Sequence, residues 1–438
     1  MSAANTRAVD RDILRLALPA LGALAAEPLY VLVDTAIVGH LGTDQLAALA
    51  IAATLITGSF TIFNFLAYGT TAQVARYHGA GQEEIAGRLA AQALWLALGI
   101  GALLAVLAVG LARPAVSLMG GEGRVADLAV LYLRISAIGL PCAMVALAGQ
   151  GYLRGVSDFR LPLVIVIGAN LVNVVLEVVF VYGFGWGIAG SAWGTVIAQL
   201  GMAAAFAAAL LRTPADTRRP NLAYLRPLLR VGSDIAVRTT ALYASFLLAS
   251  ALAARVGAAS LGAHQIGFQL FVFLALVLDA IAIAGQVIVG RTLGAGRADG
   301  AYASAKRMIG WSVVVGLAFA LVLGALVTVI PHAFTDDPRV IDRARVMWPF
   351  LAIMQPAAGA VFALDGILIG AGDTRFIKWA MVAAFACFAV VALATYRLDL
   401  GIAGVWTALL VLIGVRLVTG LARFQGRRWL VTGAPSPA

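Results

Sequence analysis

The chain has 438 residues, of which 62% are hydrophobic and only 12% are charged. Soluble domains are about half apolar and a quarter charged, so a soluble protein of this composition could not cover its own surface. The formal net charge of +10 would suit a nucleic-acid partner, but no polar segment is long enough to form a soluble domain that could bind one.

The apolar residues fall in long blocks, of the length at which a helix crosses the hydrocarbon core of a membrane. Strands of a transmembrane barrel would be shorter and would alternate in polarity, so we expect helices. The prediction is an all-α integral membrane protein with twelve transmembrane helices. In chain order the predicted spans cover residues 13–38, 46–75, 88–112, 124–149, 160–183, 187–212, 228–254, 260–290, 301–330, 339–369, 375–396 and 401–423.

The basic residues are distributed unequally between the two sides of the membrane that these spans define. With the N-terminus placed in the cytoplasm, most of the 31 Lys and Arg residues fall on cytoplasmic ends and loops, as the positive-inside rule requires. We therefore expect a multi-pass protein of the cell membrane, surrounded by the lipid bilayer, monomeric, with both termini in the cytoplasm and with no nucleic-acid partner. Cys142 and Cys387 lie in separate apolar blocks, so we interpret them as small buried side chains and expect no metal cluster.

The two halves of the sequence resemble one another at an offset of 215 residues. Matched segments include Gly79-Ala80-Gly81 with Gly294-Ala295-Gly296, and Gly151 and Asp158 with Gly366 and Asp373. Because each copy has an even number of spans, the copies enter the membrane from the same side, and a pseudo-two-fold axis along the membrane normal would relate two six-helix lobes. The predicted parts are a cytoplasmic N-terminus (1–12), an N-lobe (13–212), a cytoplasmic linker (213–227), a C-lobe (228–423) and a cytoplasmic tail (424–438).

Ionisable residues inside spans are costly and are candidates for function. Asp34 and Glu177 lie at a similar depth, roughly 8–9 Å from the outer ends of their spans at 1.5 Å per residue. Asn173 shares a helix face with Glu177, and Thr195 lies at about the same level in the sixth span. If these spans are neighbours, the four side chains converge on one pocket, where two carboxyls could share a proton or hold Na⁺ with the amide and hydroxyl oxygens.

The repeat distinguishes this pocket from the second half of the chain. The residue 215 positions after Asp34 is Ala249, and the counterpart of Glu177 is Ala392. A carboxylate needed only for packing would be expected in both copies. The asymmetry therefore places ion coupling in the N-lobe, with a structural role at a helix end as the alternative for each acid.

Other polar residues have polar counterparts, which favours a structural network facing a cleft over direct contact with ion or substrate. Asp279 corresponds to Asn64, and Asp365 to Gln150. His264 is interpreted as a hydrogen-bonded packing residue, with a proton relay as the alternative. The further candidates for polar residues of a cleft are Asn64, Gln150, Asn170, Asp279 and Asp365.

Two further predictions concern a proline in the first span and an arginine in the seventh. Pro19 removes a backbone hydrogen bond within the first span and can bend it. Arg238, inside the seventh span, is expected to pair with Asp234 four residues earlier.

Several segments together resemble the MATE family of exporters, over about residues 10–425 and in particular its DinF-like branch. They are LPALGALAAEPLYVLVDTAIVGHLGTDQLAALA, NLVNVVLEVVFVYGFGWGIAGSAWGTVIAQ, LDAIAIAGQVIVGRTLGAGR and ALDGILIGAGDTR. The resemblance implies that Asp34, Asn173 and Thr195 belong to the coupling site, and that Pro19 bends the first helix. Glu177 stands where many members carry Asp, which keeps the charge and extends its reach.

The resemblance also implies a function. It predicts a secondary active transporter, not an enzyme, that exports small organic compounds, cationic or amphiphilic, against H⁺ or Na⁺ by alternating access, with no cofactor beyond that ion. The alternative is a flippase of a lipid-linked or amphiphilic substrate, which would favour a basic cleft. A membrane enzyme would need clustered acids or a Ser/His constellation, and neither pattern is present.

Overall fold

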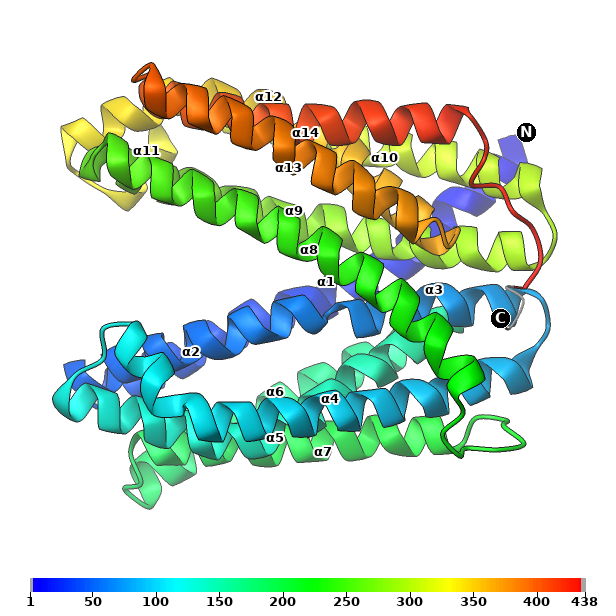
Figure 1. The fold of residues 1–438 in the computed structure, drawn as a ribbon, viewed down its shortest axis with the longest axis horizontal. Helices are drawn as coiled ribbons and strands as arrows, with labels where there is room; N and C mark the ends of the chain where they lie inside the picture. The colour runs from blue at the N-terminus through cyan, green and yellow to red at the C-terminus, as the bar shows by residue number, and fades with distance from the viewer. Residues whose placement is uncertain (1–2, 435–438) are drawn as a thin grey trace. The chain divides into compact units, whose positions relative to one another are not determined.

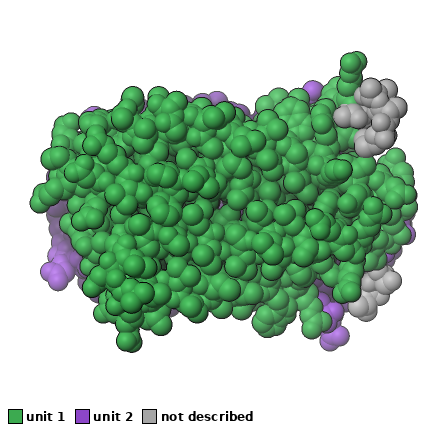
Figure 2. All heavy atoms as spheres, turned by 90° about the horizontal axis from the view of Figure 1, so that it is seen from above, with its two compact units in different colours: residues 1–21, 233–433 green, residues 22–232, 434–438 purple. Residues whose placement is uncertain are grey.

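The computed structural model describes residues 3–434, and the extreme ends of the predicted terminal segments, residues 1–2 and 435–438, lie outside that range. Two compact units are formed: unit 1 comprises the residues up to Leu21 with Ser233–Gly433, and unit 2 comprises Gly22–Gly232. Figure 2 colours the two units. All regular secondary structure in the described part of the chain is helical, which confirms the predicted fold class.

The helices of the first half are long and run alongside one another (Figure 1). They are α1 (Ala3–Gly39), α2 (Thr43–Phe63), α3 (Phe65–Gly79), α4 (Glu83–Leu118), α5 (Gly123–Gly155), α6 (Arg160–Val178), the π-helical turn η1 (Val179–Gly183) and α7 (Ile188–Leu211). Within unit 2, α5 is the central helix, packed against α2, α3, α4 and α7.

The second half repeats this plan. Its helices are α8 (Leu222–Val256), α9 (Ala258–Gly294), α10 (Ala298–Ala325), α11 (Val329–Phe334), α12 (Pro338–Gly370), α13 (Thr374–Arg397) and α14 (Gly401–Gln425). In unit 1 the central helix is α12, packed against α9, α10 and α14.

Among the described residues, 11 helices are long and apolar enough to cross a membrane, against the twelve predicted. The difference lies in the second predicted span, 46–75, which is not one helix but the pair α2 and α3. The interruption falls at Asn64, which keeps helical torsion angles (φ −55°, ψ −18°) while the run of helical hydrogen bonds stops. The block of apolar residues continues through this point, so no break is predicted there from the sequence.

Close helix packing is repeated at equivalent glycines. A Cβ atom on Gly101 would lie 2.4 Å from Cα of Pro141, and one on Gly316 would lie 2.8 Å from Cα of Pro356. Both pairs are related by the offset of 215 residues. Since real Cβ atoms do not approach this closely, each glycine lets the next helix of its unit pack directly on the proline turn. The internal repeat is therefore a repeat of packing as well as of sequence.

The first residues of α1 belong to unit 1, although the N-lobe was predicted to begin at residue 13. Asp10 accepts hydrogen bonds from Arg307 at 2.6 and 2.8 Å and from Trp311 at 2.8 Å. Asp12 accepts one from Arg291 at 3.2 Å. These acid–arginine pairs hold the start of α1 on α9 and α10, so the boundary between units falls inside one continuous helix, just after Pro19.

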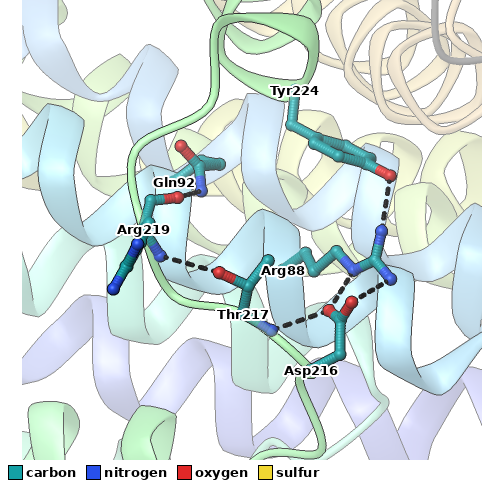
Figure 3. Close-up of polar contacts among 6 residues, drawn as sticks. All are labelled: Arg88, Gln92, Asp216, Thr217, Arg219 and Tyr224. Atoms are coloured by element: carbon teal, nitrogen blue, oxygen red, sulfur yellow. Dashed lines mark hydrogen bonds and ion pairs between the residues drawn. The ribbon is translucent and has the colours of Figure 1, made fainter.

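The irregular segment between α7 and α8 is shorter than the predicted linker, because α8 begins at Leu222. It is tied to α4 by polar contacts (Figure 3). Arg88 pairs with Asp216 and donates to the Tyr224 hydroxyl at 2.9 Å. Gln92 donates to the carbonyl of Arg219 at 2.9 Å. The segment between α7 and α8 is therefore ordered and packs against α4 within unit 2.

Candidate functional site

Two carboxyl groups meet inside unit 2. Asp34 of α1 is 6% exposed, and Glu177 of α6 is 0% exposed. The Ser191 hydroxyl of α7 donates to Asp34 Oδ1 at 2.7 Å. The Glu177 carboxyl lies next to Asp34, and neither of its two buried oxygens has a hydrogen-bond partner among the described residues. Three helices thus bring two acids and one hydroxyl together at a depth where an isolated carboxylate would be costly.

A second polar layer lies beside these carboxyls. Thr195, one turn beyond Ser191 on α7, shares a hydrogen bond of 2.9 Å with the Tyr30 hydroxyl. Asn173 donates to the Thr195 hydroxyl at 3.3 Å. Tyr132 of α5 is a further buried residue near Ser191. The site therefore presents several neutral oxygen atoms next to its two acids.

Small residues on α7 allow the helices to meet here. A Cβ on Gly190 would lie 2.8 Å from the backbone carbon of Phe180, and one on Gly194 would lie 3.2 Å from the backbone nitrogen of Glu177. Glycines four residues apart form one face of a helix and permit close approach within a membrane. The Tyr182 hydroxyl of η1 donates to the carbonyl of Ile37 at 2.8 Å, which holds η1 against α1. The backbone is thereby fixed around the carboxyl pair.

A cavity of about 360 Å³ adjoins the site, and every residue that lines it belongs to unit 2. One face of α1 forms a wall, with residues at the i, i+3, i+4, i+7 and i+8 positions of a helix face. That wall consists of Glu27, Tyr30, Val31, Asp34 and Thr35. Asp34 lines the cavity, whereas Glu177 is not among the lining residues. Asp34 is therefore the member of the pair that lies next to both the cavity and the second acid.

The structure brings together the four residues predicted for ion coupling: Asp34, Asn173, Glu177 and Thr195. Their role stays a prediction. Three further candidates line the same cavity, namely Asn64, Gln150 and Asn170. Asp279 and Asp365 do not, because they belong to unit 1.

Sequence reasoning missed four polar residues of this region: Glu27, Tyr30, Tyr132 and Ser191. Spacing could have identified three of them. Glu27 and Tyr30 lie seven and four residues before Asp34, and Ser191 lies four residues before Thr195, so each shares a helix face with a residue that was named. Tyr132 had no such signal, since the other candidate of its helix, Gln150, lies 18 residues further along the chain.

The acidic residue of unit 1 has different surroundings. Asp365 of α12 forms ion pairs with Arg238 of α8 and with Arg416 of α14, the latter at 2.6 Å. The predicted pair of Arg238 with Asp234 is wrong, because Asp234 instead pairs with Lys378 and accepts a hydrogen bond from Thr374 at 3.1 Å. Partners from other helices outcompete the i, i+4 neighbour inside a packed bundle.

His264 of α9 is completely buried in unit 1. Its Nε2 atom lies 3.1 Å from the Ser250 hydroxyl, and its ring stacks on Phe268 and meets the edge of Trp406. These contacts are those of a packing residue. Within residues 3–434, no three His, Cys, Asp or Glu side chains gather in a way that could hold a metal ion.

Comparison with known proteins gives concordant matches. The family model described as MatE matches residues 19–179 and 235–396. The chain is 32% identical to protein DETOXIFICATION 44, chloroplastic, of Arabidopsis thaliana, covering 96% of this chain and 83% of that protein. It is 30% identical to DNA damage-inducible protein F of Escherichia coli, covering 96% and 93%. A structure described as the outward-facing conformation of a multidrug resistance MATE family transporter of the MOP superfamily matches with a TM-score of 0.83 at 20% identity, covering 96% of this chain and 95% of that one.

Proposed function

This chain belongs to the MATE family of multidrug efflux transporters, and from that premise we propose that it exports organic cations and amphiphiles in exchange for H⁺. It is a multi-pass membrane protein, and members of its family transport small molecules and are not enzymes. The proposal concerns the driving ion, the class of substrate and the alternating access that couples them.

The observation that carries the proposal is the proximity of two buried carboxyls, Asp34 and Glu177, beside a cavity. Two adjacent carboxyls in a membrane interior cannot both be ionised cheaply, so one proton shared between them relieves their repulsion. Loss of that proton leaves negative charge at the cavity wall through Asp34. A cationic compound in the cavity then favours the deprotonated pair, and protonation favours its release, which is the requirement for exchange.

Sodium is the competing ion, and the second polar layer supports it. Hard cations prefer oxygen ligands. The Ser191 and Thr195 hydroxyls and the Asn173 amide oxygen are available around the acids. The proximity of the two carboxyls favours H⁺, because two neighbouring carboxyls can share one proton whereas a metal ion would separate them.

The expected setting is the cell membrane, with both termini in the cytoplasm and the protein acting as a monomer. The distribution of Lys and Arg residues supports this orientation. Cysteine accessibility at the two ends of the chain, measured in intact cells and in inverted vesicles, would test it.

Transport into inverted membrane vesicles tests the function. We expect uptake of a fluorescent organic cation when a pH gradient is imposed, with little response to a Na⁺ gradient. Asp34→Asn should abolish this uptake, while Asp44→Asn, which neutralises an exposed acid outside the site, should not. Equal uptake by Asp34→Asn and wild type would rule out the mechanism, and uptake driven by Na⁺ alone would replace the proton with Na⁺.

A further inference from the structure

A third acid, Glu27, lies on the cavity wall of unit 2. It precedes Asp34 by seven residues on α1, so the two side chains share a helix face and their Cα atoms are about 10 Å apart along the axis. The side chain of Glu27 is exposed, and the residues between the two acids on this face also line the cavity. Glu27 therefore shares the cavity with the carboxyl pair but is not in contact with it.

Glu27 differs from Asp34 and Asp365 in its bonding. Asp34 accepts a hydrogen bond from Ser191, and Asp365 is paired with two arginines. Glu27 forms no hydrogen bond or ion pair with another residue of the described chain. An ionisable side chain at membrane depth without a protein partner is costly, and such residues face a substrate or ion pathway.

The turn of α1 that carries Glu27 is held in place. Asn170 of α6 donates a hydrogen bond to the carbonyl of Ala26 at 3.2 Å. Pro28 follows directly and fixes the backbone angle at its own position. A carboxylate on a fixed turn is pre-organised to bind a ligand without the entropic cost of ordering a loop.

Most of the wall around Glu27 suits an organic cation, and Arg154 is the single cationic side chain among the lining residues. Tyr30, Tyr68 and Tyr132 line the same cavity, among apolar side chains such as Leu24 and Ala53. Aromatic faces attract cations, most strongly when water is excluded. Apolar walls bind the hydrocarbon part of an amphiphile.

We propose that Glu27 recognises the positive charge of the transported compound, and that recognition of the substrate is thereby separated from the Asp34–Glu177 pair that binds the coupling ion. The expected ligands are compounds with a quaternary or protonated nitrogen, or another permanent cation, attached to an aromatic or aliphatic body. This inference rests on the proposed export function and specifies the residue that determines its charge preference.

Binding to the purified full-length protein tests the inference. The probes are the cation tetraphenylphosphonium and the neutral compound triphenylphosphine oxide, which have similar aromatic bodies. Glu27→Gln should raise the Kd for tetraphenylphosphonium by about tenfold, while the Kd for the neutral probe changes by less than about twofold. Glu27→Asp should restore most of the affinity for the cation, and Asp44→Asn should leave both values unchanged.

A second measurement covers the case in which a variant does not fold. Carbodiimide labelling of the wild-type protein, read by peptide mass spectrometry, should modify Glu27, and tetraphenylphosphonium should protect it while triphenylphosphine oxide does not. Three results would overturn the inference. They are an unchanged Kd for the cation in Glu27→Gln, an equal loss of affinity for both probes in that variant, and the failure of tetraphenylphosphonium to protect Glu27 from labelling. Because these are binding measurements, they stand apart from gradient-driven transport, so failure of the proposed function and failure of the role of Glu27 are distinguishable.

Discussion

The two units share one helical plan but treat buried acids in opposite ways. In unit 2, Asp34 and Glu177 lie next to each other beside a cavity. In unit 1, Asp365 lies between Arg238 and Arg416. An acid neutralised by arginines has no need of an exchangeable cation, whereas a pair of acids does. The partners of a carboxylate, rather than its presence in a span, therefore decide whether it can couple transport.

The repeat shows where the units diverged. At the counterparts of Asp34 and Glu177, unit 1 has Ala249 and Ala392, both buried in its apolar core. At the counterparts of Ala23 and Gln150, which line the cavity of unit 2, unit 1 has Arg238 and Asp365. Unit 1 thus holds an ion-pair cluster at positions where unit 2 has cavity walls. The following substitutions test this difference between the units.

Asp365→Asn should have the largest effect on stability. The substitution leaves two arginines without their shared carboxylate, and breaking a buried pair by removing one partner costs about 3–5 kcal/mol. We expect a lower midpoint of thermal denaturation for the purified protein and lower expression. Asp34→Asn is the matched change in unit 2, and it should keep the wild-type midpoint because it relieves repulsion. A stable Asp365→Asn protein would mean that the cluster of unit 1 is not a locked structural element.

Glu177→Gln should have the largest effect on transport without unfolding the protein. Removal of one acid from the pair abolishes the shared proton, and we expect gradient-driven uptake to fall by about 100-fold, equivalent to about 2.7 kcal/mol. Glu177→Asp keeps the charge and should retain a substantial part of the activity. If Glu177→Gln and wild type transport at equal rates in vesicles, the pair is not the coupling site.

Gly190→Ala tests the packing that forms the pair. The added Cβ would lie within 3 Å of the backbone of Phe180, and overpacking of this kind costs about 1–3 kcal/mol. Gly201→Ala on the same helix is the control, because its Cβ would meet no atom within 4 Å. The midpoint of thermal denaturation should fall for the first variant only, and equal midpoints would show that η1 and α7 can move apart at this point.

Thr195→Val should have the smallest effect. The change preserves shape and removes the hydroxyl that bonds Tyr30 and Asn173, at a cost of about 1 kcal/mol. We expect the apparent affinity for the coupling ion in transport assays to fall by about fivefold. Thr407→Val, at an exposed threonine of α14, should change nothing. A complete loss of transport in Thr195→Val would indicate that the hydroxyl binds the ion directly.

Much of the architecture could be predicted from the sequence, because each membrane helix corresponds to a long block of apolar residues. The fold class, the internal repeat and the approximate limits of most helices follow from that pattern. The break at Asn64 and the grouping of the start of α1 with unit 1 did not follow, since both depend on contacts. The break at Asn64 has no local sequence signature. The grouping of the start of α1 with unit 1 depends on the contact between Asp10 and Arg307, which are far apart in sequence.

Some residues of the candidate site could be predicted from the sequence and others could not. Asp34, Asn173, Glu177 and Thr195 were identified because charged and polar residues are rare in spans and because the repeat lacks them in the other half. Tyr132 comes from a different helix and could be placed only by the packing. The partner of Arg238 was mispredicted because helix spacing describes neighbours on one helix, whereas a buried arginine selects its partner from all the helices around it.

The most direct test of the central claim, that the exchangeable charge resides in the carboxyl pair of unit 2, is proton release on substrate binding. Tetraphenylphosphonium would be added to the purified protein in weakly buffered, Na⁺-free solution containing a pH-indicator dye. We predict that wild type and Asp44→Asn release protons on binding, and that Asp34→Asn and Glu177→Gln release none. Proton release of wild-type size from Asp34→Asn and Glu177→Gln would contradict the account.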